Sequence, residues 1–139
     1  DWINVIARTK DHKFVMIRQY RHGLDETRYE ICAGVIDPGE KPLKAAKREL
    51  YEETGYGKGT WREISVISGN PSVTNNLTHC FVATDVECIS TQHLEKSEDI
   101  SVHLLSTEEV LSLLVNDQIK QALMLAPLWK FFAEEKLLY

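Results

Sequence analysis

The chain has 139 residues, of which 43% are hydrophobic and 27% are charged, and its formal net charge at pH 7 is -5. This composition is typical of a globular protein that can bury a core, and it predicts one domain over residues 1–139. The negative charge argues against non-specific nucleic-acid binding, and no stretch is long and apolar enough to suggest contact with a membrane interior.

Three cysteines, Cys32, Cys80 and Cys88, form an odd set without the spacing of a metal site. This favours free thiols in a reducing compartment. Because no signal peptide is visible, we expect a cytoplasmic protein. The chain starts at Asp1 with a strand-like sequence, and we expect that an N-terminal segment precedes it in the whole protein.

The N-terminal part of the chain is rich in β-branched runs. Three of them are expected to be strands: residues 3–9, 13–20 and 29–33. Lys10-Asp11-His12 separates the first two and predicts a hairpin. Pro38-Gly39 then marks a loop. The periodicity from Leu43 to Thr54 predicts a helix, with Pro42 in its first turn and Gly55 at its C-terminal cap.

The second half predicts more strands and two further helices. The expected strands are residues 61–67, 77–88 and 100–105. Ser106-Thr107-Glu108-Glu109 has the form of a capping box and should open a helix that ends at Val115. Asn116 or Asp117 is expected to cap the last helix, which Pro127 should kink or break. Together these elements predict an α/β protein, a mixed sheet with helices on its faces in an α/β/α sandwich.

The pattern Gly-x5-Glu-x7-Arg-Glu-Leu-x-Glu-Glu-x-Gly, from Gly34 to Gly55, is the most informative feature of the sequence. On a helix Glu49 and Glu53 lie about 40° apart, with Glu52 beside them. Like charges at this spacing cost roughly 0.2–0.5 kcal/mol per pair. A solvated acidic face is the ordinary explanation. A magnesium ion that also binds a phosphate-bearing substrate is the functional one.

The pattern resembles the signature motif of the Nudix hydrolases, enzymes that cleave a nucleoside diphosphate linked to another moiety. The likeness covers residues 34 to 56 and departs at Tyr56, where the family usually has an aliphatic residue. It implies the Nudix α/β/α fold and a divalent cation, Mg²⁺ with Mn²⁺ as the alternative. It also implies the metal ligands: the carbonyl of Ala33 and the carboxylates of Glu49, Glu52 and Glu53.

Arg48 lies four residues before Glu52 and is expected to orient that carboxylate, with a plain surface ion pair as the alternative. The motif does not fix the general base, because some family members use a glutamate of the motif, here Glu52 or Glu53. Others use a glutamate from a downstream loop. Glu98, directly before Asp99-Ile100, resembles that residue in ADP-ribose pyrophosphatases, and its alternative is a solvated loop charge.

The segment before the motif also resembles the ADP-ribose pyrophosphatases. Arg21 is expected to contact the diphosphate, with a solvent-exposed strand end as the alternative. Pro71 follows Gly55 by sixteen residues, an offset that marks ADP-ribose-cleaving members and predicts substrate contact. Two departures weaken the likeness: Cys32 stands where proline is frequent, and residues 71–76 lack the glutamate commonly found there.

The resemblance therefore implies magnesium-dependent hydrolysis of a small nucleotide substrate, ADP-ribose first, to AMP and ribose 5-phosphate, by a homodimer. Neither nucleic acid nor a membrane is expected as a partner. The alternatives are another nucleotide sugar, a nucleoside triphosphate, or a non-catalytic nucleotide sensor.

Overall fold

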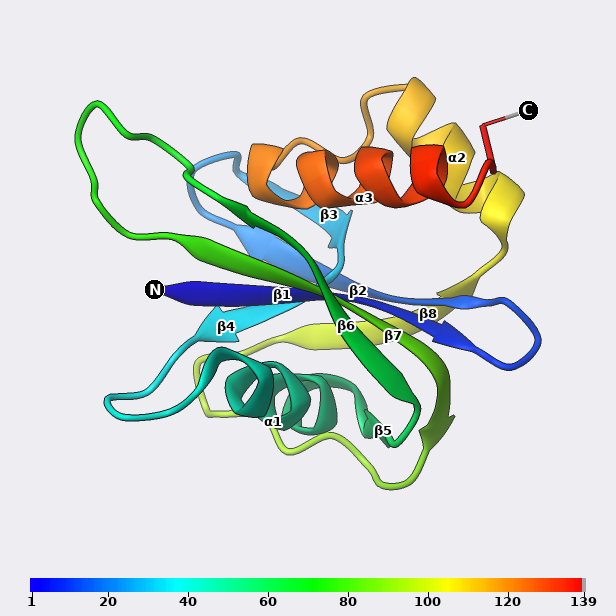
Figure 1. The fold of residues 1–139 in the computed structure, drawn as a ribbon, viewed down its shortest axis with the longest axis horizontal. Coiled ribbons are helices and arrows are strands. Elements are labelled where there is room, and N and C mark those ends of the chain that lie inside the picture. Colours follow the sequence, from blue (N-terminus) through cyan, green and yellow to red (C-terminus); the bar gives the residue numbers. More distant parts are fainter. Residues whose placement is uncertain (139) are drawn as a thin grey trace.

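The computed structural model describes residues 1–138, and within them eight strands and three helices form three layers (Figure 1). The strands are β1 (Trp2–Thr9), β2 (Phe14–Arg21), β3 (Glu26–Glu30), β4 (Cys32–Val35), β5 (Tyr56–Gly57), β6 (Thr60–Ile67), β7 (Thr78–Cys88) and β8 (Ile100–Leu105). The helices are α1 (Pro42–Thr54), α2 (Thr107–Val115) and α3 (Ala122–Glu134). Tyr139, the last residue of the expected domain, lies outside the described residues.

Strand β1 lies at the centre of a mixed sheet in the order β3-β2-β1-β7-β5. It runs parallel to β7 and antiparallel to β2 and β4. Strand β8 pairs with β2, and β6 pairs with β7. The expected mixed sheet of an α/β protein is therefore confirmed.

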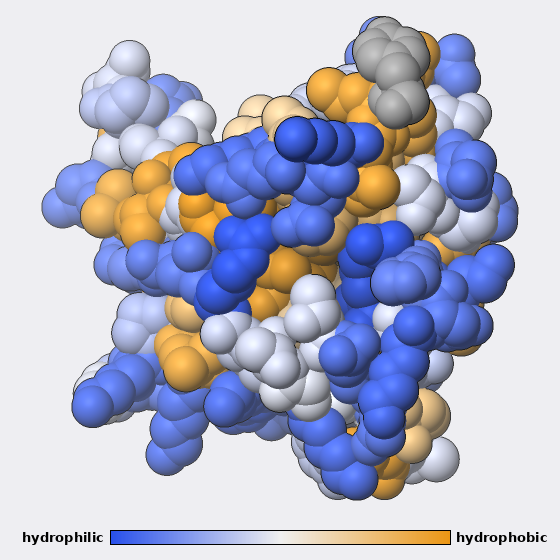
Figure 2. Space-filling model, turned by 45° about the vertical axis from the view of Figure 1, so that its right-hand side comes forward, coloured by the Kyte–Doolittle hydropathy of each residue, from blue (hydrophilic) through white to orange (hydrophobic). Residues whose placement is uncertain are grey.

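The two faces of the sheet carry separate apolar cores. Helix α1 covers one face, whereas α2 and α3 cover the other (Figure 1). On the α1 face, Ala46 and Leu50 pack in one buried cluster with Val5. On the opposite face, Phe14 stacks on Phe132. Hydrophilic side chains cover most of the surface in the view of Figure 2, as expected for a chain with many charged residues.

No helix within residues 1–138 combines the length and the apolar character needed to cross a membrane.

Local signals set the ends of the first two helices as expected. Pro42 occupies the start of α1, and Gly55 adopts the left-handed conformation at its end, with φ of 78°. The capping box at α2 is present, because Glu109 N donates to Ser106 Oγ at 3.1 Å and Ser106 N donates to Glu109 Oε1 at 3.2 Å. These parts of the sequence-based prediction are confirmed.

Two expectations about the strands were incomplete. The expected strand at residues 29–33 is two strands, β3 and β4, which meet at the buried residue Ile31. Strand β3 begins in a charged stretch, and its pairing with β2 rather than its own apolar pattern makes it a strand. The two-residue strand β5 was not expected either, and it pairs with the end of β7.

The expected start of the last helix was wrong. Asn116 is the C-terminal cap of α2, and Asp117 follows it with a positive φ of 54°. The next helix begins only after Gln121, which stands at its N-terminal cap position. Ile119 between the two helices is buried at 1% exposure. The chain between α2 and α3 is therefore not helical, and it places the apolar side chain of Ile119 in the core.

The expectation that Pro127 would break or kink α3 was also wrong in its first part, because the helix continues from Ala122 to Glu134. A proline lacks the N–H that would bond to the carbonyl four residues earlier, here that of Leu123. In this protein Asn4 Nδ2 donates to Leu123 O at 2.8 Å. A side chain of the central strand thus satisfies the carbonyl that the proline leaves free.

This contact predicts a coupling between strand and helix. Replacing Asn4→Ala should lower the free energy of unfolding by about 1–3 kcal/mol, because Leu123 O loses its donor inside the protein. In a Pro127→Ala background the same replacement should cost less, since the alanine introduced there has an N–H that can bond to Leu123 O. Denaturant unfolding of the two single variants and the double variant measures the coupling. An equal cost in both backgrounds would contradict this explanation.

Candidate active site

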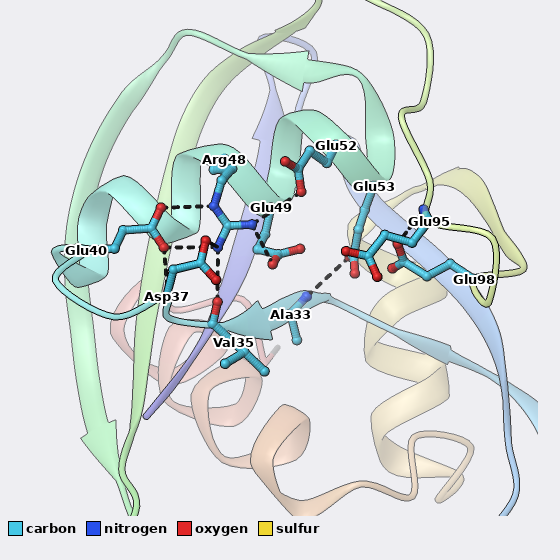
Figure 3. Close-up of polar contacts among 10 residues, drawn as sticks. All are labelled: Ala33, Val35, Asp37, Glu40, Arg48, Glu49, Glu52, Glu53, Glu95 and Glu98. Carbon is cyan, nitrogen blue, oxygen red and sulfur yellow. Dashed lines mark hydrogen bonds and ion pairs between the residues drawn. The ribbon is translucent and has the colours of Figure 1, made fainter.

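The loop after β4 leads directly into α1 and is closed by its own hydrogen bonds. Glu40 N donates to Asp37 O at 3.0 Å, and Asp37 N donates to Glu40 Oε1 at 3.1 Å. Gly39 has a positive φ of 77°, a conformation that costs glycine little. The loop therefore carries the Glu40 carboxylate back towards the helix (Figure 3).

Arg48 lies at the centre of this arrangement (Figure 3). Its Nε and Nη2 donate to the two carboxylate oxygens of Glu40 at 2.9 and 3.0 Å. Nη2 also donates to Val35 O at 3.0 Å. Nη1 donates to Glu49 Oε1 at 2.9 Å and to Glu52 Oε2 at 3.2 Å. One guanidinium thus joins the loop to two of the three glutamates expected to bind metal.

Glu40 is a structural partner of Arg48 in this geometry. The hydrogen bonds from Arg48 are the main reason that the pKa of Glu40 falls to about 2. Its carboxylate therefore stays charged at any ordinary pH and keeps the loop attached to α1.

The third glutamate, Glu53, is only 5% exposed and points from α1 towards β4 (Figure 3). Ala33 N donates to Glu53 Oε2 at 3.4 Å, a long contact. Burial raises the pKa of Glu53 to about 8; the Cys32 thiol opposes this rise, and the charges of Glu49 and Glu98 add to it. Burial also raises the pKa of Glu49. Arg48 therefore offsets only part of the negative charge of the three glutamates.

The residues present suit a hard cation. Carboxylates from Glu49, Glu52 and Glu53 and the carbonyl of Ala33 supply oxygen ligands, the type that magnesium prefers. No ready-made group of three ligating side chains exists among residues 1–138. Magnesium does not need one, because it keeps several waters and binds through one or two carboxylates together with substrate phosphates.

Gly34 leaves the space that the Glu49 carboxylate occupies. A Cβ at residue 34 would lie 2.2 Å from Glu49 Cδ and 2.4 Å from Glu49 Oε1. The absence of a side chain at Gly34 is therefore required for the Glu49 carboxylate to lie where it does.

A cavity of about 270 Å³ adjoins the carboxylates of Glu53 and Glu98. Its lining also includes Arg21 and the polar residues Asn4, Thr78 and Gln121. The structure thus brings the motif together with two distant residues selected from the sequence, Arg21 and Glu98. Glu98 belongs to the loop before β8 and lies near Glu53 (Figure 3).

Arg21 is held by a partner that the sequence did not reveal. Its Nε and Nη2 donate to the two oxygens of Glu30 at 2.9 and 2.7 Å, and Glu30 is 3% exposed. A charged residue inside a strand is ordinarily read as solvent-exposed, so no sequence signal marked this pair. Within residues 1–138 no hydrogen bond engages Arg21 Nη1, which leaves that group available at the cavity wall.

Pro71 lies apart from this cluster. It is exposed in the loop between β6 and β7 and does not line the cavity. The roles expected for Pro71, Arg21, Glu98, Arg48 and the metal ligands stay predictions.

Comparisons with known proteins identify the family of the chain. A family model described as the NUDIX domain matches residues 2–126. The chain is 31% identical over 121 residues to an ADP-ribose pyrophosphatase of Bacillus subtilis, a match that covers 86% of this chain and 65% of that protein. It is also 31% identical over 118 residues to a methanol dehydrogenase activator of Bacillus methanolicus, covering 84% and 64% of the two chains.

A solved structure described as an ADP compounds hydrolase superposes with a TM-score of 0.85, at 24% identity, over 97% of this chain and 72% of that one. At this identity the likeness shows the fold. The chain spans less than two thirds of the length of the two curated relatives.

The space at Gly34 gives a sharp test of the metal site. Gly34→Ala should fold, because the clash falls on a flexible side chain, but it should displace the Glu49 carboxylate. We expect divalent-metal affinity to fall by about 10–100-fold, the scale for groups that orient ligands. Calorimetric titration with Mg²⁺ or Mn²⁺ measures it. Gly23→Ala is the matched control, since no atom lies within 4 Å of its added Cβ. Unchanged affinity in Gly34→Ala would contradict the assignment.

The pKa of Glu53 predicts a pH dependence of stability in metal-free protein. Folding raises this pKa from 4.5 to about 8, so the folded state holds the proton more tightly. The stability gained is complete below about pH 4.5 and is lost as the pH rises to about 8. Denaturant midpoints should therefore fall between about pH 5 and pH 8, and fall less in Glu53→Gln. Parallel profiles for the two proteins would refute the origin in Glu53.

Proposed function

Since the chain belongs to the NUDIX domain family, we propose that it is a hydrolase that cleaves a nucleoside diphosphate linked to another moiety. The observation that carries the proposal is the acidic cluster of α1, in which Arg48 holds Glu49 and Glu52 while Glu53 lines a cavity together with Arg21 and Glu98. A diphosphate bound in the cavity would meet the guanidinium of Arg21 and the carboxylates of Glu53 and Glu98.

We propose ADP-ribose as the substrate, with AMP and ribose 5-phosphate as the products. The ADP-ribose pyrophosphatase of Bacillus subtilis supports this choice. The cavity also supports it, because Asn4 Oδ1 and Gln121 Oε1 find no hydrogen-bond partner within residues 1–138. Asn4 Nδ2 is engaged by Leu123 O, so the oxygen of that amide is the atom left for a ligand donor, such as a ribose hydroxyl or an amino group.

In the reaction a water oxygen attacks one phosphorus of the diphosphate, and the bond from that phosphorus to the bridging oxygen breaks. Arg21 Nη1 would bind a diphosphate oxygen while Glu30 holds the rest of its guanidinium. Arg48 would keep the Glu49 and Glu52 carboxylates oriented. A carboxylate must take the water proton, and we assign this role to Glu98 or to a glutamate of the motif, Glu52 or Glu53.

The metal would be held by Glu49, Glu52, Glu53 and Ala33 O, and we propose Mg²⁺, with Mn²⁺ as a substitute. When bound, it would neutralise charge on the diphosphate oxygens and lower the pKa of a water molecule. The carboxylates of Glu53, which is buried, and Glu49, which is half-buried, both have a raised pKa, and this supports a cation at this place.

We further propose a cytoplasmic homodimer. The free thiols of Cys32, Cys80 and Cys88 support a reducing compartment. For the dimer, the support is a set of exposed apolar side chains around the start of β1. Trp2 and Val35, which are partners across β1 and β4, line the cavity, and Leu77 lies beside Trp2.

Two alternatives remain open to the same test. Another nucleotide sugar or a nucleoside triphosphate would use the same carboxylates. A non-catalytic nucleotide sensor would bind without turnover, and the name of the second relative, an activator, keeps this alternative in view.

Incubation with Mg²⁺ and ADP-ribose, beside a panel of nucleotide sugars, dinucleotides and nucleoside triphosphates, should release AMP and ribose 5-phosphate from ADP-ribose. Product chromatography measures it. Glu53→Gln should keep the fold and slow turnover by orders of magnitude, because an amide replaces a charged ligand.

Turnover of another panel member alone would discard the substrate and keep the reaction class. Binding of ADP-ribose without any turnover would replace the hydrolase by the sensor. Near-normal turnover in Glu53→Gln would overturn the metal assignment.

A further inference from the structure

The loop between β7 and β8 is fastened to the C-terminal end of α1. The last carbonyls of a helix have no partner within the helix and need donors from elsewhere. Here His93 N donates to Glu52 O at 2.7 Å, and Ile89 N and Ser90 N donate to Gly55 O at 2.9 and 3.1 Å. The loop therefore begins its course against the helix that carries the acidic cluster.

Two side chains of the loop also contact α1: the ring of His93 stacks on Tyr51, and Gln92 forms hydrogen bonds. The Nε2 of Gln92 donates to Glu53 O at 2.8 Å and to Ile100 O at 2.9 Å. Glu53 belongs to α1, and Ile100 is the first residue of β8. Both hydrogens of a half-buried primary amide are thus used to join the helix to the strand at which the loop ends.

Glu98 lies two residues before that strand. A short turn holds it, in which Glu98 N donates to Glu95 O at 3.0 Å and Glu95 N donates to Glu98 Oε1 at 2.9 Å. The turn is fixed within itself, but its position relative to α1 depends on where the loop is anchored. Two anchors precede the turn in the chain, the bond from His93 N to Glu52 O and the double contact of Gln92. Of these two, the contact of Gln92 also reaches β8, the strand that follows the turn.

We propose that Gln92 is a positioning residue that sets the place of the Glu98 carboxylate relative to Glu53, and through it the rate of hydrolysis. This rests on the proposed function, in which Glu98 acts at the cavity. Gln92 itself reaches two backbone carbonyls and does not line the cavity. It therefore acts through Glu98 and not on the substrate.

The chemistry of the two contacts restricts the residue type. Two carbonyl oxygens require two hydrogens from one group, which a primary amide supplies. Gln92→Met has similar length and no donor. Gln92→Glu keeps the shape but places carboxylate oxygens against carbonyl oxygens. Gln92→Asn keeps both donors on a shorter arm.

The expected result is a fall in kcat of about 10–100-fold in Gln92→Met, because displacements near 1 Å can cost about 10²-fold, with KM for ADP-ribose nearly unchanged. Gln92→Glu should be at least as slow. Gln118→Met is the matched control: its amide also donates to a carbonyl, that of Asn116, on the α2–α3 connection. It should keep full activity.

A double-variant cycle with Glu98→Gln separates positioning from general damage. If Gln92 acts through Glu98, Gln92→Met should reduce kcat no further once Glu98→Gln is present. Independent, multiplying losses would overturn the proposal. An unchanged kcat in Gln92→Met would also overturn it. If Gln92→Met does not fold, Gln92→Asn takes its place in the double-variant cycle.

Hydrogen exchange gives a readout that does not need activity. The amides of Glu95 and Glu98 should exchange faster in Gln92→Met, whereas amides of α2 should not. Unchanged exchange at the amides of Glu95 and Glu98 would show that Gln92 does not hold the loop in place, and it would overturn the proposal whatever the activity. Absence of turnover in the unmodified protein, together with faster exchange in the variant, would overturn the proposed function and leave the fastening in place.

Discussion

The contact between Arg48 and four carboxylates is the interaction on which the candidate site depends. Besides Glu40, Glu49 and Glu52, the guanidinium lies 3.6 Å from Asp37 Oδ2. Only a planar group with five donors can serve the loop and two helical carboxylates at once, and a lysine ammonium with three donors could not. Arg48 thereby holds the carboxylates together without neutralising the whole set.

The helix α1 is restrained at its middle and at its C-terminal end, and the restraints differ in kind. From its middle, Arg48 attaches it to Glu40 in the preceding loop by an ion pair and to the last carbonyl of β4, Val35 O, by a hydrogen bond. At its end, backbone donors of residues 89–93 satisfy its carbonyls, and a Cβ on Gly55 would lie 2.1 Å from Ser90 O. Charge positions the side chains of Glu49 and Glu52, while close backbone packing fixes the helix from which they extend.

The parts of the fold that the sequence predicted well are those with local causes. Gly55 ends α1 through its own backbone freedom, and Ser106 and Glu109 cap α2 with each other. Pro127 was misjudged because the donor that compensates it, Asn4, lies 119 residues away from the carbonyl it satisfies. The site follows the same division. The spacing of Glu49, Glu52 and Glu53 is visible in one helix, whereas the Arg21–Glu30 pair and the double contact of Gln92 arise from tertiary packing.

The central position of β1 affects how the chain reaches this structure. Trp2 pairs with Thr78, 76 positions later, and Arg8 pairs with Thr84 in the same register. A parallel pairing between strands so far apart in the sequence forms slowly, because the entropy of closing a long loop is lost before the stabilising contacts form. During synthesis at about 5–20 residues per second, roughly 4–15 s pass between the synthesis of β1 and that of β7. Throughout that interval Ile3, Val5 and Ile6, which are fully buried at the end, lack their β7 neighbours. The nascent chain is therefore most exposed to aggregation, and most in need of a chaperone, before the second half of the sheet has been made.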